Sequence, residues 1–473
     1  MAAHLIAKDC MPFYSKGVEL SANAMKFGQN TEAIKALAQF NEAGFVVPIG
    51  NRYDNDADSK IAYSPFETRP VTFSDGTSAR VWQAGRYIGE AVIDKTKITI
   101  KPRFGENCLL AMLNDVCHFK YIAGDNKQQS GKDWNEIVKL IVRYLWIQKF
   151  VTADKYGLPR ITSKHQQQGI QIRGHVNIRK TIWPYITKGQ VVSEYREKEI
   201  DDAICRIVYK AYSILAKGGI SKSIIPTQIQ NSLDALYTCY HGQECVVSED
   251  EYQNIRYKRI FQSWKPLTDF SWQIVKQHSF SMTYTEELKG NSLFLDMAEI
   301  WESFLRKCLG EILACEEYGG WQVVPQSECE TQVYDSQFYR RKLIPDLLFR
   351  RVANGKDQYI VLDAKYKRMN GRKEDVDRTD FFQIHSYIQY YASLDHSEVV
   401  LGGLLYPLES SDIDKRDWAS ATLFGSSAGK TRFIVDGICL SDIPNNIGDT
   451  KAVSELLRHR INNMIKTWNL LTI

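Results

Sequence analysis

Two acids and a lysine near the C-terminal end of the chain have types and spacing that suit hydrolytic chemistry. Asp346 lies at the start of a short apolar segment, and Asp363 and Lys365 lie at the end of the next one. The dipeptide Asn354-Gly355 between the two segments is typical of a tight hairpin turn. Two paired strands would bring Asp346 and Asp363 together, and the alternation of side chains along a strand would place Asp363 and Lys365 on one face.

Two carboxylates and an ammonium group are costly to bury together unless they hold a cation and one another. Aspartate oxygens, together with the backbone carbonyl of Ala364, suit Mg²⁺, which prefers hard oxygen ligands. Such a metal could polarise a phosphate and help to generate hydroxide, while Lys365 orients or deprotonates the attacking water. The residues therefore predict metal-assisted hydrolysis of a phosphodiester bond, with Asp346 and Asp363 as metal ligands.

A purely structural explanation competes with this one, because the pattern of two acids and a lysine is short and common. One acid could be a turn residue, and the other could form an exposed ion pair with Lys365. The context favours a functional site, because both predicted strands are strongly apolar and two predicted helices offer further polar groups. The upstream helix carries Glu302, and the downstream helix places Gln383 and Tyr387 four residues apart on one face.

The elements that must position these residues belong to the last of three regions. Residues 1–125 contain short β-branched and aromatic runs, which predict a β-rich N-terminal region. Residues 126–288 show mostly helical periodicity, with one alternating, strand-like segment at 170–178. Residues 289–473 read as helix, strands, helix and strand, the order of an α/β layered domain. We expect the site to lie in this C-terminal α/β domain.

Composition narrows the class of protein. The chain has 473 residues, 44% hydrophobic and 25% charged, which is typical of a soluble globular protein. Its apolar runs are too short to span a bilayer and its first residues do not resemble a secretory signal, so we expect a cytoplasmic protein with no membrane partner. The net charge is only +4, so a nucleic-acid surface must be local. Residues 339–378 supply one, with twelve Lys and Arg against six Asp and Glu.

Two other motifs suggest ligands but lack the pattern that these ligands need. Cys239, His241 and Cys245 offer three potential zinc ligands with no fourth nearby in the sequence, whereas a structural zinc site takes four. The segment 425–431 resembles a phosphate-binding loop, but it has three residues between its glycines where that loop has four. We therefore expect neither a zinc ion nor a nucleotide on this chain, and Mg²⁺ as its cofactor.

The acidic motif resembles that of the PD-(D/E)xK nuclease superfamily, and the Gln383 and Tyr387 pair resembles the additional motif of its RecB-like branch. The wider pattern is similar to the McrC family, the nuclease subunits of McrBC-type restriction systems. The similarity is strongest over residues 291–407 and extends upstream through AGRYIGEAVIDKTKITIKPRFG at 84–105. It implies that residues 289–473 form a RecB-like PD-(D/E)xK endonuclease domain. The first 80 residues match no pattern.

The McrC resemblance implies a role for each candidate residue. The three acids and the Ala364 carbonyl would bind Mg²⁺, so that Glu302 joins the two aspartates. Lys365 would serve the attacking water. Gln383 and Tyr387 would position the substrate or the strands that carry the motif.

The same resemblance implies partners. The chain would be a double-stranded DNA endonuclease of a restriction or phage-defence system that assembles with a separate McrB-like AAA+ GTPase and stimulates it, with residues 1–125 docking on the motor. Two alternatives remain open: a non-catalytic adaptor that activates a motor NTPase, and a stand-alone RecB-like repair nuclease. About 290 residues without a motor motif precede the site region, which favours a partner-dependent subunit.

Overall fold

The computed structural model describes most of the chain and groups it into two compact units. The first unit joins Met1–Val138 to Phe280–Ile473, and the second is Lys139–Ser279. The described residues are 3–15, 18–19, 66–72, 78–93, 96–117, 134–216, 225–243, 245–284, 293–329, 331–335, 340–369, 376–409, 420–422, 431–443 and 450–470. The segment 425–431, which was predicted not to bind a nucleotide, lies outside the described residues except for Thr431.

The first unit contains a six-stranded sheet that is built mainly from the N-terminal region. Its strand order is β11-β6-β7-β1-β2-β3. β1 pairs in parallel with β7, and the fully buried Ile98 and Ile100 of β7 contribute to the core. The strands are β1 (Ala3–Lys8), β2 (Tyr14–Ser15), β3 (Val18–Glu19), β6 (Tyr87–Ile93), β7 (Thr96–Lys101) and β11 (Leu293–Asp296).

The two predicted regions at either end of the chain share this N-terminal sheet. β11 precedes the helix that carries Glu302, yet it pairs antiparallel with β6 over its whole length. The separate hairpin of β4 (Phe66–Thr72) and β5 (Ser78–Ala84) and the helix α2 (Glu106–Cys117) complete the described part of the N-terminal region. The prediction separates 1–125 from 289–473, whereas the structure groups them in one unit.

A second six-stranded sheet carries the candidate site. Its order is β12-β15-β16-β17-β19-β18. The predicted hairpin is present: β15 and β16 pair antiparallel across Asn354 and Gly355, whose positive φ values of 53° and 72° suit the tight turn. The strands are β12 (Gln322–Val323), β15 (Leu347–Ala353), β16 (Lys356–Ala364), β17 (Ser397–Leu408), β18 (Ser420–Thr422) and β19 (Arg432–Cys439).

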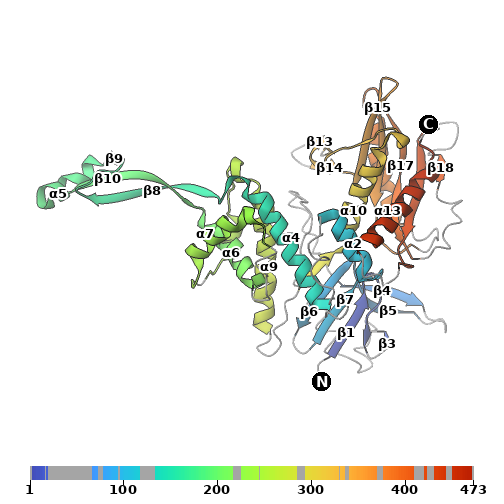
Figure 1. Cartoon of the computed structure of the whole chain (residues 1–473), viewed down its shortest axis with the longest axis horizontal. Helices are drawn as coiled ribbons and strands as arrows, with labels where there is room; N and C mark the ends of the chain where they lie inside the picture. The colour runs from blue at the N-terminus through green and yellow to red at the C-terminus, as the bar shows by residue number, and fades with distance from the viewer. Residues whose placement is uncertain are drawn as a thin grey trace. The chain divides into compact units, whose positions relative to one another are not determined.

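Helices cover this second sheet and make the first unit a mixed α/β structure (Figure 1). The connection from β16 to β17 contains α12 (Arg378–Ala392), which is consistent with the parallel pairing of the two strands. Ile384 and Ile388 of α12 pack with Val361 of β16 in a buried core. The helices α10 (Met297–Leu313) and α13 (Thr450–Thr467) contact each other and the sheet. Two short strands, β13 (Thr331–Asp335) and β14 (Arg340–Leu343), pair separately.

The second unit has a helical core. Trp146, Phe150, Trp264 and Phe270 are fully buried in it, and the Trp146 indole donates a hydrogen bond to Ser271 Oγ at 2.9 Å. The aromatic residues at 264 and 270 therefore serve packing. The helices are α4 (Trp134–Ala153), α6 (Asp202–Ala216), α7 (Thr227–Tyr240), α8 (Glu249–Gln253) and α9 (Trp264–Tyr284).

A long two-stranded ribbon projects from this helical core (Figure 1). β8 (Arg160–Gly169) and β10 (Val191–Ile200) pair antiparallel over their full length, and the short β9 (His175–Val176) and the helix α5 (Ile178–Lys188) lie at the far end. We call residues 160–200 the arm. The strand expected at 170–178 is reduced to two residues, and the long strands flank it. No helix among the described residues has the length and apolar character needed to cross a bilayer.

Candidate active site

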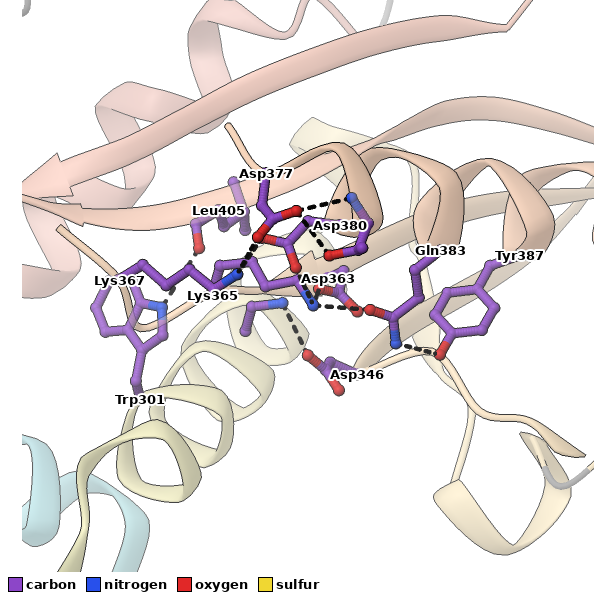
Figure 2. Close-up of polar contacts among 12 residues, drawn as sticks. Trp301, Asp346, Asp363, Lys365, Lys367, Asp377, Asp380, Gln383, Tyr387 and Leu405 are labelled. Atoms are coloured by element: carbon purple, nitrogen blue, oxygen red, sulfur yellow. Dashed lines mark hydrogen bonds and ion pairs between the residues drawn. The ribbon is translucent and has the colours of Figure 1, made fainter. Parts of the chain in front are cut away.

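The pairing of β15 with β16 brings the two predicted aspartates together. Leu347 lies opposite Leu362, so Asp346 and Asp363, one residue further along each strand, lie at the same end of the pair. The Ala364 backbone N–H donates a hydrogen bond to Asp346 Oδ2 at 3.0 Å, which fixes the first carboxylate beside the second (Figure 2). The convergence expected from the hairpin is present in the structure.

Asp363 carries a buried carboxylate. Only 1% of its side chain is exposed, and its Oδ2 lies 2.7 Å from Lys365 Nζ. Its Oδ1 has no hydrogen-bond partner among the described residues. Burial, followed by the negative charge of Asp346, raises the pKa of Asp363 to about 7. The ion pair with Lys365 thus compensates the buried charge only in part, and the net effect on the pKa is upward.

Lys365 lies in a cage of acceptors. Besides Asp363, its Nζ donates to Gln383 Oε1 at 2.9 Å and lies 3.4 Å from Asp380 Oδ1, while its backbone N–H donates to the carbonyl of Leu405. Burial lowers the pKa of Lys365, but the attraction of Asp363 and Asp380 outweighs it and the net change is upward. In this arrangement the lysine is an ammonium group.

The predicted pair on the helix α12 holds this lysine in place. Gln383 accepts from Lys365 through its Oε1 and donates through its Nε2 to Tyr387 Oη at 2.8 Å (Figure 2). Tyr387 is buried, and this burial raises its pKa to about 12. The phenol is therefore a neutral group, and the chain of hydrogen bonds from Lys365 to Tyr387 restricts the orientation of the Gln383 amide.

A further acid at the site was not predicted from the sequence. Asp380 is buried on the first turn of α12, where it lies 2.6 Å from Lys367 Nζ and 3.4 Å from Lys365 Nζ. It precedes Gln383 by three residues and therefore shares its helix face. The helical spacing of Asp380, Gln383 and Tyr387 was the signal in the sequence that could have identified it.

Glu302 is placed differently from the other predicted residues. It is buried on α10, and its Oε1 accepts from Arg306 Nη2 at 2.9 Å, while Arg306 Nε donates to the backbone carbonyl of Asp346 at 3.1 Å. Arg306 thus links Glu302 to the site. Within the described ranges, no three acids, histidines or cysteines are close enough together to hold a metal ion. The structure brings Asp346 and Asp363 together, and the role of Glu302 as a third metal ligand stays a prediction.

The donor atoms at the site suit a divalent cation with oxygen ligands. Asp363 Oδ1 is buried without a hydrogen bond, and the adjacent Asp346 carboxylate repels it. A cation shared by the two would remove both costs. Mg²⁺ keeps several of its waters, so two carboxylates and a backbone carbonyl such as that of Ala364 are sufficient protein ligands.

The basic residues near the site are engaged within the protein to a greater extent than the sequence suggested. Arg350 pairs with Asp357, Arg368 forms two hydrogen bonds to Glu409, and Lys367 pairs with Asp380. Arg351 stacks on the ring of Trp321. The rest of the basic segment includes residues 370–375, which lie outside the described residues.

Comparison with known proteins identifies the family. The family model "McrBC 5-methylcytosine restriction system component" matches residues 82–407. The chain belongs to this family. In this McrBC-family chain, the match contains every predicted site residue from Glu302 to Tyr387 as well as the whole arm. It ends before β19 and α13.

Two solved assemblies from Thermococcus gammatolerans are also similar to this McrBC-family chain. One is a half-complex from a tetradecameric assembly of McrB AAA+ hexamers with bound McrC, at 14% identity and a TM-score of 0.46, covering 91% of this chain and 93% of that one. The other is a McrBC complex, at 15% identity and a TM-score of 0.37, covering 66% and 88% respectively. No curated protein matches the chain.

Proposed function

We propose that this chain is the McrC-type nuclease subunit of an McrBC-like restriction system and that it hydrolyses DNA phosphodiester bonds with Mg²⁺. The observation that carries the proposal is the buried Asp363 carboxylate beside Asp346, with Lys365 on the same face. Membership of a 5-methylcytosine restriction family supports DNA as the substrate. The two paired strands and α12 would then be the motif-bearing part of a RecB-like PD-(D/E)xK domain.

The residues divide the chemistry among them. Asp346, Asp363 and the Ala364 carbonyl would hold Mg²⁺, which supplies Lewis-acid activation of the phosphate and of a bound water. Lys365 is charged, so it would orient the water and stabilise the negative charge that develops on the phosphate oxygens, rather than accept a proton. Gln383 would keep the ammonium group directed towards that point. Of the two roles expected for Lys365, the structure favours orientation.

The exposed surface at the tip of the arm is evidence that this chain binds a partner protein. The helix α5 has no buried residue, and Ile178, Ile182 and Ile186 form an exposed apolar stripe at four-residue spacing, with Trp183 beside it at 75% exposure. Exposed apolar patches of this kind mark protein-binding surfaces. We assign this surface to an AAA+ motor subunit, so that docking involves the arm rather than residues 1–125 alone.

Cleavage of methylated DNA tests the nuclease assignment. The full chain, a candidate McrB-like AAA+ motor subunit, GTP, Mg²⁺ and methylated duplex DNA are mixed, and linear products are followed on gels. Asp363→Asn should abolish cleavage, since it removes a metal ligand. Asp357→Asn is the matched control, because Asp357 lies on the same strand but pairs with Arg350 away from the site. Cleavage by Asp363→Asn at the wild-type rate would rule out the proposal.

The same assay separates the two alternative functions. A non-catalytic adaptor would stimulate GTP hydrolysis by the motor, and neither the wild-type chain nor Asp363→Asn would produce cuts. A stand-alone repair nuclease would cut without the motor. The proposed subunit cuts only with the motor present, and its Asp363→Asn variant still stimulates GTP hydrolysis.

A further inference from the structure

A buried charged cluster joins the N-terminal sheet to the segment that carries Lys365. We call it the Arg103 cluster: Asp9, Arg103, Phe104, Tyr366 and Glu409. Asp9 follows β1 and Arg103 follows β7, and the two strands pair in parallel, so both residues leave the same edge of the sheet. The Arg103 backbone N–H donates to Asp9 Oδ1 at 2.5 Å, and Arg103 Nε lies 3.7 Å from Asp9 Oδ2.

Asp9 and Arg103 are both buried. The side chain of Asp9 is 0% exposed and that of Arg103 is 3% exposed. Burying such a pair contributes little net stability, because the loss of hydration offsets most of the attraction. The pair therefore calls for a role other than holding the sheet together, and its contacts on the far side of Arg103 indicate one.

Those contacts lie on the residues directly after the candidate site. The guanidinium carbon of Arg103 lies 4.6 Å from the ring centres of both Phe104 and Tyr366, so the planar group is flanked by two aromatic rings. Arg103 Nη2 donates to the carbonyl of Lys367 at 3.2 Å. Arg103 Nη1 lies 3.6 Å from Glu409, which in turn accepts two hydrogen bonds from Arg368.

Lys365 is thus constrained from both sides along the backbone. Before it, the N–H of Ala364 is bound to Asp346, and after it, Tyr366 and Lys367 are held by Arg103. A displacement of about 1 Å in an active-site group can reduce a rate by about a hundredfold. The constraint at residues 366–368 therefore bears directly on where the ammonium group of Lys365 lies.

We propose that Arg103 is a positioning residue for Lys365, and that the N-terminal sheet is thereby a structural part of the nuclease site. The proposal rests on the nuclease function proposed above. Arginine suits this role because its planar group can stack between two rings while its N–H groups bind a carbonyl and two carboxylates. Lysine supplies the charge but neither the stacking plane nor the fork of donors.

Hydrogen–deuterium exchange tests the positioning role without relying on activity. In the full-length chain, Arg103→Met should raise exchange about tenfold in a peptide covering residues 365–369, while exchange within β15 stays unchanged. Arg103→Lys preserves the buried charge and should therefore disturb folding less than Arg103→Met. It should give an intermediate increase in exchange at residues 365–369. Arg350→Met is the matched control, because it also breaks an arginine–aspartate pair but one that is half exposed and lies elsewhere.

DNA cleavage by the assembled complex gives the second readout. Arg103→Met should lower kcat about tenfold or more with little change in KM for DNA, and Arg103→Lys should recover part of the loss. Unchanged exchange at 365–369, or raised exchange with an unchanged kcat, overturns the positioning role. If the wild-type complex does not cut DNA, the nuclease function itself is overturned. The exchange data test only the positioning role, so the two failures can be distinguished.

Discussion

Replacing Asp363 with asparagine should make the protein inactive and, without metal, more stable. The substitution keeps the shape of the side chain and removes a negative charge that is 1% exposed. Burial and Asp346 raise the pKa of this carboxyl from its ordinary value of 3.8 to about 7. A difference of about three pH units corresponds to roughly 4 kcal/mol, which is the upper limit on what the wild-type chain loses by ionising Asp363 in the folded state.

The dependence of this effect on pH has a definite sign. Because the folded-state pKa lies above the unfolded one, the folded protein binds the extra proton between about pH 4 and pH 7, and wild-type stability falls as the pH rises through that window. The asparagine variant has no such proton. Its advantage over the wild type should be small near pH 4, grow by about 1.4 kcal/mol per pH unit at most, and reach roughly 2–4 kcal/mol at pH 8.

Urea-induced unfolding in EDTA at pH 5 and pH 8 measures this advantage. Adding Mg²⁺ at pH 8 should stabilise the wild-type chain and leave the variant nearly unchanged, because ligand binding favours only a folded state that has the site. Asp357→Asn serves as control and should lose at most about 1 kcal/mol at both pH values, since it breaks only a surface pair. If Asp363→Asn is less stable than the wild type at pH 8, or if its advantage is the same at pH 5, the carboxylate is not held at a cost and the reasoning fails.

Three further substitutions, one of them with a matched control variant, probe other parts of the structure. Asp380→Asn should lower the single-turnover cleavage rate about tenfold with a smaller effect on DNA binding. The reason is that Lys365 and Lys367 would both lose a charged acceptor. An unchanged rate would show that Asp380 plays no part in the reaction. Gly403→Ala should destabilise the chain by about 1–3 kcal/mol in urea unfolding, because its Cβ would lie within 3 Å of the Ile434 backbone. Gly169→Ala, where a Cβ meets nothing closer than 3.9 Å, should stay within about 0.5 kcal/mol. Trp183→Ser should weaken binding to the motor subunit by about 2 kcal/mol in a titration. The melting temperature should not change, since this indole is exposed in the free chain. Binding at wild-type strength would show that the tip of the arm is not part of the interface.

The parts of the site that were predicted from the sequence are those that depend on local geometry. The turn at Asn354-Gly355 requires positive φ values, which favour that dipeptide, and the turn sets the register that brings Asp346 and Asp363 together. The spacing of Gln383 and Tyr387 is a property of any helix. A period of two or of 3.6 residues is visible in a single sequence, so these placements could be anticipated.

The parts that were missed depend on contacts between distant segments. Nothing in the local pattern of β11 indicates that it pairs with β6, about two hundred residues earlier in the chain. The arm was underestimated because β8 is largely exposed, so the apolar alternation that identifies a strand is weak there. The Arg103 cluster unites residues 9, 103, 366 and 409, whose proximity follows only from the packing of the N-terminal sheet against the end of β16.

By itself, the sequence determined the chemical groups of this protein and their spacing within each strand and helix, because backbone geometry converts spacing into a shared face. Only the tertiary structure decided which groups meet. It placed Asp380 beside Lys365, linked Glu302 to Arg306, and joined the segment that follows β16 to the N-terminal sheet. The physical reason is that burial and desolvation depend on the whole fold, and they determine whether neighbouring charges repel, pair or bind a cation.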